Sequence, residues 1–321
     1  MIVDEHGRRF RNLRLSLTAA CNYACTYCVP DGKKLQAADR ELSEADLIRA
    51  VHLLMRVAGI EKVHLTGGEP LLSPKFDATL ADLMHLQLRD VAVTTNGQFL
   101  VRKAKTIINS GLTRMNISLD TLDGSRFREL ARSGDLKTVL EGIDLMLAAG
   151  LKIKINMVPL RRGNIDQILP MLNFALERGI ELRYIELMNM GHLKNSGAYQ
   201  QDFVGMEEIL ALIGEKYEYA RTEAPFDSTA VRFEIPNKGV FGIIANESEP
   251  FCTSCTRLRL SSNGYLYGCL SNANRHDLTE VLGLEEPVAT ETLTNLLHSA
   301  LQSKQAVSFS GEVTVMKFIG G

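Results

Sequence analysis

The sequence predicts an α/β protein built as an incomplete (β/α)6 barrel, followed by a smaller C-terminal region. Six short apolar runs alternate with segments of helical periodicity in the first 187 residues. Glycines stand where those helices should end, and polar motifs follow the apolar runs. Such repetition favours a parallel sheet with right-handed crossovers, and six units are too few to close the usual eight-stranded barrel.

The barrel elements follow from local patterns. Strands are expected at residues 13–18, 63–66, 91–95, 115–119, 153–158 and 182–187. A helix should begin after Ser43, which opens a segment resembling a capping box. Further helices are expected at 74–88, 100–109, 136–149 and 165–178, with left-handed caps at Gly59, Gly111, Gly150 and Gly179.

The C-terminal region has a different pattern. We place the barrel at residues 1–220 and the smaller region at 221–321, with one apolar helix at 206–213 near the crossing. Residues 231–235 and 240–244 alternate like short strands. Residues 258–260 and 266–268 are expected to form a hairpin around a Ser-Asn-Gly turn.

Composition limits the functional classes. The 321 residues are 45% hydrophobic, which is enough for a full core, and carry a net charge of −2. That charge gives no general attraction to nucleic acid or to an anionic membrane. The polar start and the absence of a long apolar run favour a soluble, cytoplasmic protein.

The 6 cysteines fall into two groups of three. Cys21, Cys25 and Cys28 lie on one loop directly after the first expected strand, and the expected hairpin brings Cys269 back towards Cys252 and Cys255. Such spacing in a reducing compartment favours metal binding. Three thiolates leave one iron of a four-iron cluster open to a small molecule, whereas structural zinc would need a fourth ligand. His276 is a candidate fourth ligand for zinc at the second group.

Polar residues stand at the carboxyl ends of the expected strands, where the active groups of such barrels gather. The second strand ends in Thr-Gly-Gly-Glu-Pro, and the two glycines would let the backbone approach a ligand closely. Arg257 and Arg259 alternate on a strand and therefore share one face beside the second cysteine group. Two guanidinium groups on one face suit a phosphate.

The cysteine loop together with Thr-Gly-Gly-Glu-Pro resembles the radical S-adenosylmethionine (SAM) superfamily, which implies a TIM-like partial barrel. The wider set resembles the GTP 3′,8-cyclase family of molybdenum cofactor biosynthesis along nearly the whole chain. It includes Pro-Asp-Gly at 30–32, Ser-Leu-Asp-Thr-Leu-Asp at 118–123, Ile-Glu-Leu-Met at 185–188, the Cys-x-x-Cys-x-Arg-Leu-Arg segment, and a terminal Gly-Gly.

The resemblance implies a site. The two cysteine groups would each hold a [4Fe-4S] cluster, the first cleaving SAM and the second binding GTP. The residues implied for SAM are Tyr27, Gly67, Gly68, Glu69, Ser118 and Met188. Those implied for GTP are Arg14, His64, Thr95, Lys154, Arg183, Arg257, Leu258 and Arg259. The groups implied in catalysis are Arg257, Arg259, Gly320 and Gly321, since the family's tail enters the active site.

The implied reaction is that of a lyase. A 5′-deoxyadenosyl radical takes the ribose 3′ hydrogen of GTP, and the carbon radical attacks C8 to give (8S)-3′,8-cyclo-7,8-dihydroguanosine 5′-triphosphate. An electron donor and a downstream enzyme that forms the cyclic pyranopterin are the implied partners, and a homodimer is compatible with the resemblance.

Two departures leave alternatives open. His64 and Ser73 stand where the family has basic residues, and a histidine is at best partly charged near neutral pH. One alternative is a radical SAM maturase with an auxiliary cluster that acts on a peptide or another nucleotide. The other is a non-catalytic zinc-binding protein.

Overall fold

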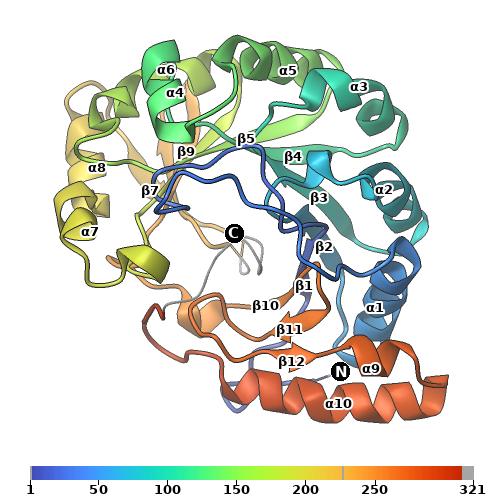
Figure 1. Cartoon of the computed structure of the whole chain (residues 1–321). Helices are drawn as coiled ribbons and strands as arrows, with labels where there is room; N and C mark the ends of the chain where they lie inside the picture. Colours follow the sequence, from blue (N-terminus) through green and yellow to red (C-terminus); the bar gives the residue numbers. More distant parts are fainter. Residues whose placement is uncertain (1, 226–227, 313–321) are drawn as a thin grey trace.

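The computed structural model describes residues 2–225 and 228–312. In that part of the chain, twelve strands form one sheet in the order β12-β11-β10-β1-β2-β3-β4-β5-β6-β9-β8-β7. The sheet curves into an open barrel, and helices α2 to α6 cover its outside as an arc (Figure 1).

All six strands expected in the barrel are present, and each pairs in parallel with the next. They are β1 (Asn12–Ser16), β2 (Lys62–Thr66), β3 (Asp90–Thr95), β4 (Arg114–Ser118), β5 (Lys152–Met157) and β6 (Glu181–Ile185). The predicted fold class is therefore confirmed. Their carboxyl ends lie at one edge of the sheet, as parallel strands require.

The C-terminal region lengthens the same sheet at both edges. β9 (Gly239–Ile244) pairs in parallel with β6, and β10 (Arg257–Leu260) pairs in parallel with β1. The described chain thus holds eight consecutive parallel strands, β10, β1 to β6 and β9, where the sequence predicts six. The added pairings join segments far apart in sequence, so the local alternation of strand and helix gives no sign of them. The division at residue 220 stays a prediction.

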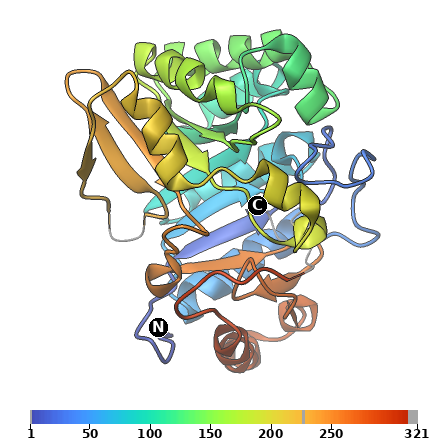
Figure 2. The ribbon, with the colours of Figure 1, turned by 90° about the vertical axis from the view of Figure 1, so that its left-hand side faces the viewer.

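Short antiparallel strands flank the parallel ones. The predicted hairpin is β10 with β11 (Tyr265–Tyr267), and β12 (His276–Asp277) extends it. At the other edge, β8 (Val231–Ile235) pairs with β9, and β7 (Ala220–Thr222) pairs with β8. Figure 2 shows these two antiparallel ends on opposite sides of the parallel strands.

The predicted helices are confirmed; those expected at 74–88, 136–149 and 165–178 are shorter than predicted. They are α1 (Glu44–Val57), α2 (Phe76–His85), α3 (Leu100–Asn109), α5 (Leu136–Ala148), α6 (Ile168–Glu177) and α8 (Met206–Gly214). The side chain of Ser43 caps α1 by accepting from the Asp46 backbone N–H. The four predicted glycine caps adopt positive φ angles. Four helices were not predicted: α4 (Gly124–Ala131), α7 (Gly197–Asp202), α9 (Thr279–Leu282) and α10 (Glu286–Gln302).

The two faces of the sheet differ in character. On β1, Leu13 and Leu15 are fully buried in the apolar core that packs against the helices, while Arg14 between them faces the interior of the barrel. The same alternation on β10 buries Leu258 and turns Arg257 and Arg259 inward. The barrel interior is therefore a basic cavity. None of the helices in the described residues is both long enough and apolar enough to cross a membrane.

Candidate active site

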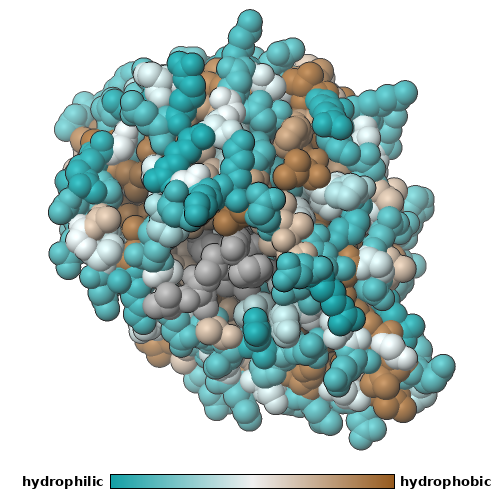
Figure 3. Space-filling model, viewed as in Figure 1, coloured by the Kyte–Doolittle hydropathy of each residue, from teal (hydrophilic) through white to brown (hydrophobic). Residues whose placement is uncertain are grey.

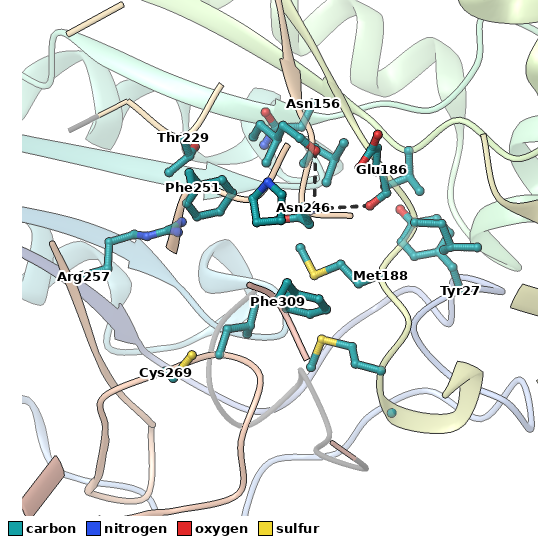
Figure 4. Close-up of a pocket in the computed structure, with 18 of the residues that line it drawn as sticks. Tyr27, Asn156, Glu186, Met188, Thr229, Asn246, Phe251, Arg257, Cys269 and Phe309 are labelled. Atoms are coloured by element: carbon teal, nitrogen blue, oxygen red, sulfur yellow. Dashed lines mark hydrogen bonds between the residues drawn. The ribbon is translucent and has the colours of Figure 1, made fainter. Parts of the chain in front are cut away.

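A cavity of about 390 Å3 occupies the interior of the barrel at the carboxyl ends of the strands. Its size is typical of a small-molecule site. Cys28 of the first cysteine group and all three cysteines of the second line it. Figure 4 shows Tyr27 and Met188 on one side of the cavity and Arg257 and Cys269 on the other. The outer surface around it is mostly hydrophilic, with smaller apolar areas between (Figure 3).

The first cysteine loop is held by residues from neighbouring strand ends. Asn96, after β3, donates its side-chain amide to the Asn22 side chain at 2.8 Å. The Tyr23 hydroxyl donates to the Gln98 side chain at 2.8 Å. Arg132, just beyond α4, donates to the Val29 carbonyl at 2.9 Å from a left-handed backbone conformation. The unpredicted helix α4 thus helps to fix the loop.

Tyr27 and Asp120 join this loop to the ends of β4 and β5. The Tyr27 hydroxyl donates to one carboxylate oxygen of Asp120 at 2.8 Å, and the Val158 backbone N–H donates to the other at 2.8 Å. Burial raises the pKa of Asp120 to about 6, although both hydrogen bonds oppose the shift. Both side chains line the cavity, together with Ser118. From the sequence, Asp120 was a candidate only as a polar residue at a strand end, with no ligand assigned to it.

Gly67 and Gly68 pack directly against the strand that leads into the loop. A β-carbon on Gly67 would lie 2.6 Å from the Thr18 carbonyl oxygen, and one on Gly68 would lie 2.2 Å from that of Ala20. The Gly68 and Glu69 backbone N–H groups already donate to those two carbonyls, each at 2.8 Å. The glycines are therefore required by the backbone packing of the loop itself, a reason that the sequence does not reveal.

Glu69 organises the turns after β2 and β3 and is not in the cavity wall. Its carboxylate accepts from the Thr95 hydroxyl at 2.7 Å and from the backbone N–H groups of Asn96 at 2.8 Å and Leu71 at 2.9 Å. Burial raises its pKa to about 7, against the effect of these hydrogen bonds. Glu69 thereby positions Asn96, which in turn contacts the cysteine loop.

The donor chemistry of the first cysteine group fits an iron–sulfur cluster. Thiolates are the ligands of such clusters, and each binds a separate iron. Burial raises the pKa of Cys21 to about 12 and raises that of Cys25 well above its usual value, so both are thiols until metal ions displace their protons. Within residues 2–225 and 228–312, no three Cys, His, Asp or Glu side chains converge on a single metal ion.

In the second cysteine group, Cys255 and Cys269 are closer to the thiolate state, whereas burial raises the pKa of Cys252. The short helix η4 (Cys252–Ser254) carries the first cysteine, and the β10–β11 hairpin brings Cys269 alongside. Burial raises the pKa of Cys255, but Arg257 and Lys304 outweigh it and hold that pKa well below its usual value. The pKa of Cys269 is also lowered, because Lys304 and the Ser271 hydrogen bond outweigh burial. Three sulfurs facing a cavity fit a cluster with an open position.

Guanidinium groups line the cavity between the two cysteine groups. They come from Arg14, Arg183, Arg257 and Arg259. Burial, with the neighbouring guanidiniums, lowers the pKa of Arg14 well below its usual value and that of Arg259 to about 9. The Nε–H groups of Arg14 and Arg183 are buried without a hydrogen-bond partner in the described residues. Buried donors of this kind fit an anionic ligand.

Four residues predicted to bind GTP lie outside the cavity wall: His64, Thr95, Lys154 and Leu258. Thr95 points to Glu69, and the adjacent Thr94 faces the cavity instead. The Leu258 side chain is fully buried in the core, so only its backbone could meet a ligand. Lys154 donates to Glu181 at 2.8 Å.

His64 lies inside the barrel in a pair with Arg114. Its Nε2 is 2.9 Å from an Arg114 nitrogen, and that guanidinium also pairs with Asp90. Burial, and then Arg14 and Arg114, lower the pKa of His64 well below its usual value. His64 is therefore a neutral acceptor near neutral pH.

Other predicted residues fall elsewhere. His276 lies on β12 and is not in the cavity wall, and Gly320 and Gly321 lie outside the described residues. The cavity wall also includes residues that the sequence did not assign to a ligand: Thr94, Asn156, Asn246, Phe251, Lys304 and Phe309. Among these, Thr94 and Asn156 carried a signal, as polar residues on expected strands.

Two family models match the chain. Residues 15–175 match the radical SAM superfamily, and residues 180–309 match Molybdenum Cofactor Synthesis C. GTP 3′,8-cyclase 1 of Pseudomonas aeruginosa is 35% identical, with 99% of this chain and 97% of that protein covered. GTP 3′,8-cyclase of Helicobacter pylori is 37% identical over 88% of this chain and 87% of its own length.

Solved structures show the same fold. Streptococcus suis SuiB bound to S-adenosylmethionine superposes with a TM-score of 0.65 over 92% of this chain and 68% of that one, at 16% identity. This likeness concerns the fold alone. The coverage and identity of the cyclase relatives, with both family models, show that the chain belongs to the GTP 3′,8-cyclase family of radical SAM enzymes.

Proposed function

We propose that this protein converts GTP to (8S)-3′,8-cyclo-7,8-dihydroguanosine 5′-triphosphate, an early step of molybdenum cofactor biosynthesis. One observation carries the proposal: a single cavity joins the first cysteine loop, the second cysteine group and a set of buried guanidiniums. Family membership supports one cluster, SAM and a GTP substrate. The second cluster and the residue roles below are part of the proposal.

On the first side of the cavity, Cys21, Cys25 and Cys28 would hold the cluster to which SAM binds. The bound cluster and SAM supply a carbon radical that removes a hydrogen atom from the substrate. Tyr27, Ser118 and Met188 line the cavity next to Cys28 and would orient SAM. The hydrogen bond from Tyr27 to Asp120 holds the first cysteine loop against the end of β4.

On the opposite side, Cys252, Cys255 and Cys269 would hold the second cluster beside the guanine of GTP. Arg14, Arg183, Arg257 and Arg259 would bind the triphosphate, because buried guanidiniums form strong charge-assisted hydrogen bonds with phosphate. Arg257 also lies against Phe251, with 4.6 Å between its guanidinium carbon and the ring centroid. The ribose would then lie between the two groups of cysteines.

The apolar part of the wall excludes water from the reaction. Figure 4 shows Met188, Phe251 and Phe309 among the side chains around the cavity, and none of them donates a hydrogen bond. A closed, apolar wall protects a carbon radical from solvent. An electron donor, a downstream pyranopterin-forming enzyme and a homodimer remain expectations of the family resemblance.

The test uses the reconstituted protein under anaerobic conditions. We would add SAM and dithionite with GTP, with ATP, or with no nucleotide, and quantify 5′-deoxyadenosine and nucleotide products by mass spectrometry. The proposal predicts a cyclised product isomeric with GTP in the GTP reaction, and faster SAM cleavage there than in the other two. Equal SAM cleavage in all three, with GTP recovered intact, would contradict GTP as the substrate.

A further inference from the structure

Lys304 is a buried lysine beside the second cysteine group. It stands two residues after the end of α10 (Glu286–Gln302) and is 7% exposed. Its ammonium nitrogen lies 3.3 Å from the Cys255 sulfur, 3.0 Å from the Arg257 carbonyl oxygen and 2.8 Å from the Gly268 carbonyl oxygen. An ammonium has three N–H donors, and these three acceptors match them in number. The position of the charge is therefore fixed.

The Arg257 and Gly268 carbonyls lie on opposite sides of the β10–β11 hairpin, close in sequence to Cys255 and Cys269. Arg257 opens β10 two residues after Cys255, and Gly268 directly precedes Cys269. The helix approaches this point closely, because a β-carbon on Gly268 would lie 2.1 Å from the Ala300 carbonyl oxygen. Lys304 therefore ties α10 to both sides of the hairpin at the level of the sulfurs.

We propose that Lys304 is a positioning residue for the second cluster, and that its ammonium raises the reduction potential of that cluster through an N–H···S hydrogen bond to Cys255. The inference rests on the proposed second cluster. Reduction adds one negative charge to a cluster, so a charged donor on a ligand sulfur stabilises the reduced form more than the oxidised form.

The first cysteine group has a different donor. The Tyr23 backbone N–H donates to the Cys21 sulfur at 3.4 Å, and this donor is neutral. A neutral donor stabilises added charge less than an ammonium does. Lys304 therefore makes the second cluster easier to reduce than its three cysteines alone would make it.

The test isolates the second cluster. The parent protein carries Cys21→Ala, Cys25→Ala and Cys28→Ala, and the variant adds Lys304→Met. Both are reconstituted anaerobically, their iron content is measured, and the cluster is titrated by electron paramagnetic resonance at set potentials. We expect Lys304→Met to move the reduction equilibrium at least tenfold towards the oxidised form, which is about 59 mV for one electron. Lys304→Arg retains the positive charge and should keep the reduction potential close to that of the parent.

The control uses the other cluster. With Cys252, Cys255 and Cys269 replaced by alanine, Lys304→Met should leave the potential of the first cluster unchanged. Full iron content with an unchanged potential in the isolated second cluster would overturn the role of Lys304. A parent that binds no iron would instead overturn the second cluster of the proposed function. If Lys304→Met loses iron, Lys304→Gln is compared with Lys304→Arg, and equal potentials in those two would overturn the inference.

Discussion

The buried guanidinium of Arg183 should reduce the stability of the ligand-free protein and enable it to bind an anion. Burial, with Arg114 nearby, lowers the pKa of Arg183 from its usual value to about 10, against the attraction of Glu181. This lowering corresponds to about 3 kcal/mol of folding free energy, at about 1.4 kcal/mol for each pKa unit. Arg183 is charged in both states near neutral pH, so the folded protein bears the full cost.

Arg183→Met removes that cost and also one interaction. The Arg183 side chain donates to the buried Asn116 side chain at 2.8 Å, and leaving that acceptor buried without its donor costs about 1–3 kcal/mol. We therefore expect the free energy of unfolding of the variant, in the absence of GTP, to equal that of the wild type or to exceed it by up to about 2 kcal/mol. Saturating GTP should stabilise the wild type and have much less effect on the variant.

The assay is urea unfolding of the reconstituted protein with and without GTP. Arg221→Met is the matched control, because Arg221 is exposed and pairs with Glu249 at the surface, where ion pairs contribute about 0–1 kcal/mol. It should change neither the stability nor the effect of GTP appreciably. The reasoning would be refuted if Arg183→Met destabilised the ligand-free protein, or if GTP stabilised it as much as the wild type.

Three further substitutions test the supporting residues. Burial raises the pKa of Glu69 from 4.5 to about 7, so the free energy of unfolding should fall by about 3 kcal/mol as pH rises through this range. Glu69→Gln should abolish this pH-dependent fall in the free energy of unfolding, measured by urea unfolding. A pH dependence equal to that of the wild type would show that Glu69 does not cause the fall. Gly68→Ala would place a methyl group 2.2 Å from the Ala20 carbonyl oxygen, and it should lower the iron content of the reconstituted protein by at least half. An iron content equal to that of the wild type would count against the packing argument. His64→Arg should lower the Michaelis constant for GTP, because it adds a positive charge to the barrel interior. An unchanged or higher Michaelis constant would show that a charge at position 64 does not strengthen GTP binding.

The sequence predicted most of the barrel because its signals are local. Apolar runs, helix caps and glycines at helix ends locate β1 to β6 and five of the helices around them. The pairing of β9 with β6 and of β10 with β1 depends on contacts between distant segments, so no local pattern reveals it. The extension of the parallel sheet at both edges was therefore missed.

The site was predicted where a motif marks it and missed where a single side chain acts alone. The two cysteine groups, Arg257 and Arg259 were found from their spacing, and one cavity is lined by Cys28 of the first group, by all three cysteines of the second and by both arginines. Thr95 was assigned to GTP from the family resemblance, but it is the adjacent Thr94 that lines the cavity. Which of two adjacent strand residues faces inward depends on the register of the strand, and the sequence does not show that register. Lys304 follows a helix without any motif, and only the folded chain brings it to Cys255.

The most direct test of the central claim follows one hydrogen atom. GTP carrying deuterium at the ribose 3′ carbon is incubated anaerobically with the reconstituted protein, SAM and dithionite, and the 5′-deoxyadenosine formed is analysed by mass spectrometry. Because the radical takes the ribose 3′ hydrogen, we predict that 5′-deoxyadenosine gains one deuterium. If 5′-deoxyadenosine forms at the same rate without deuterium, the radical reacts elsewhere, and this protein is not the cyclase that we propose.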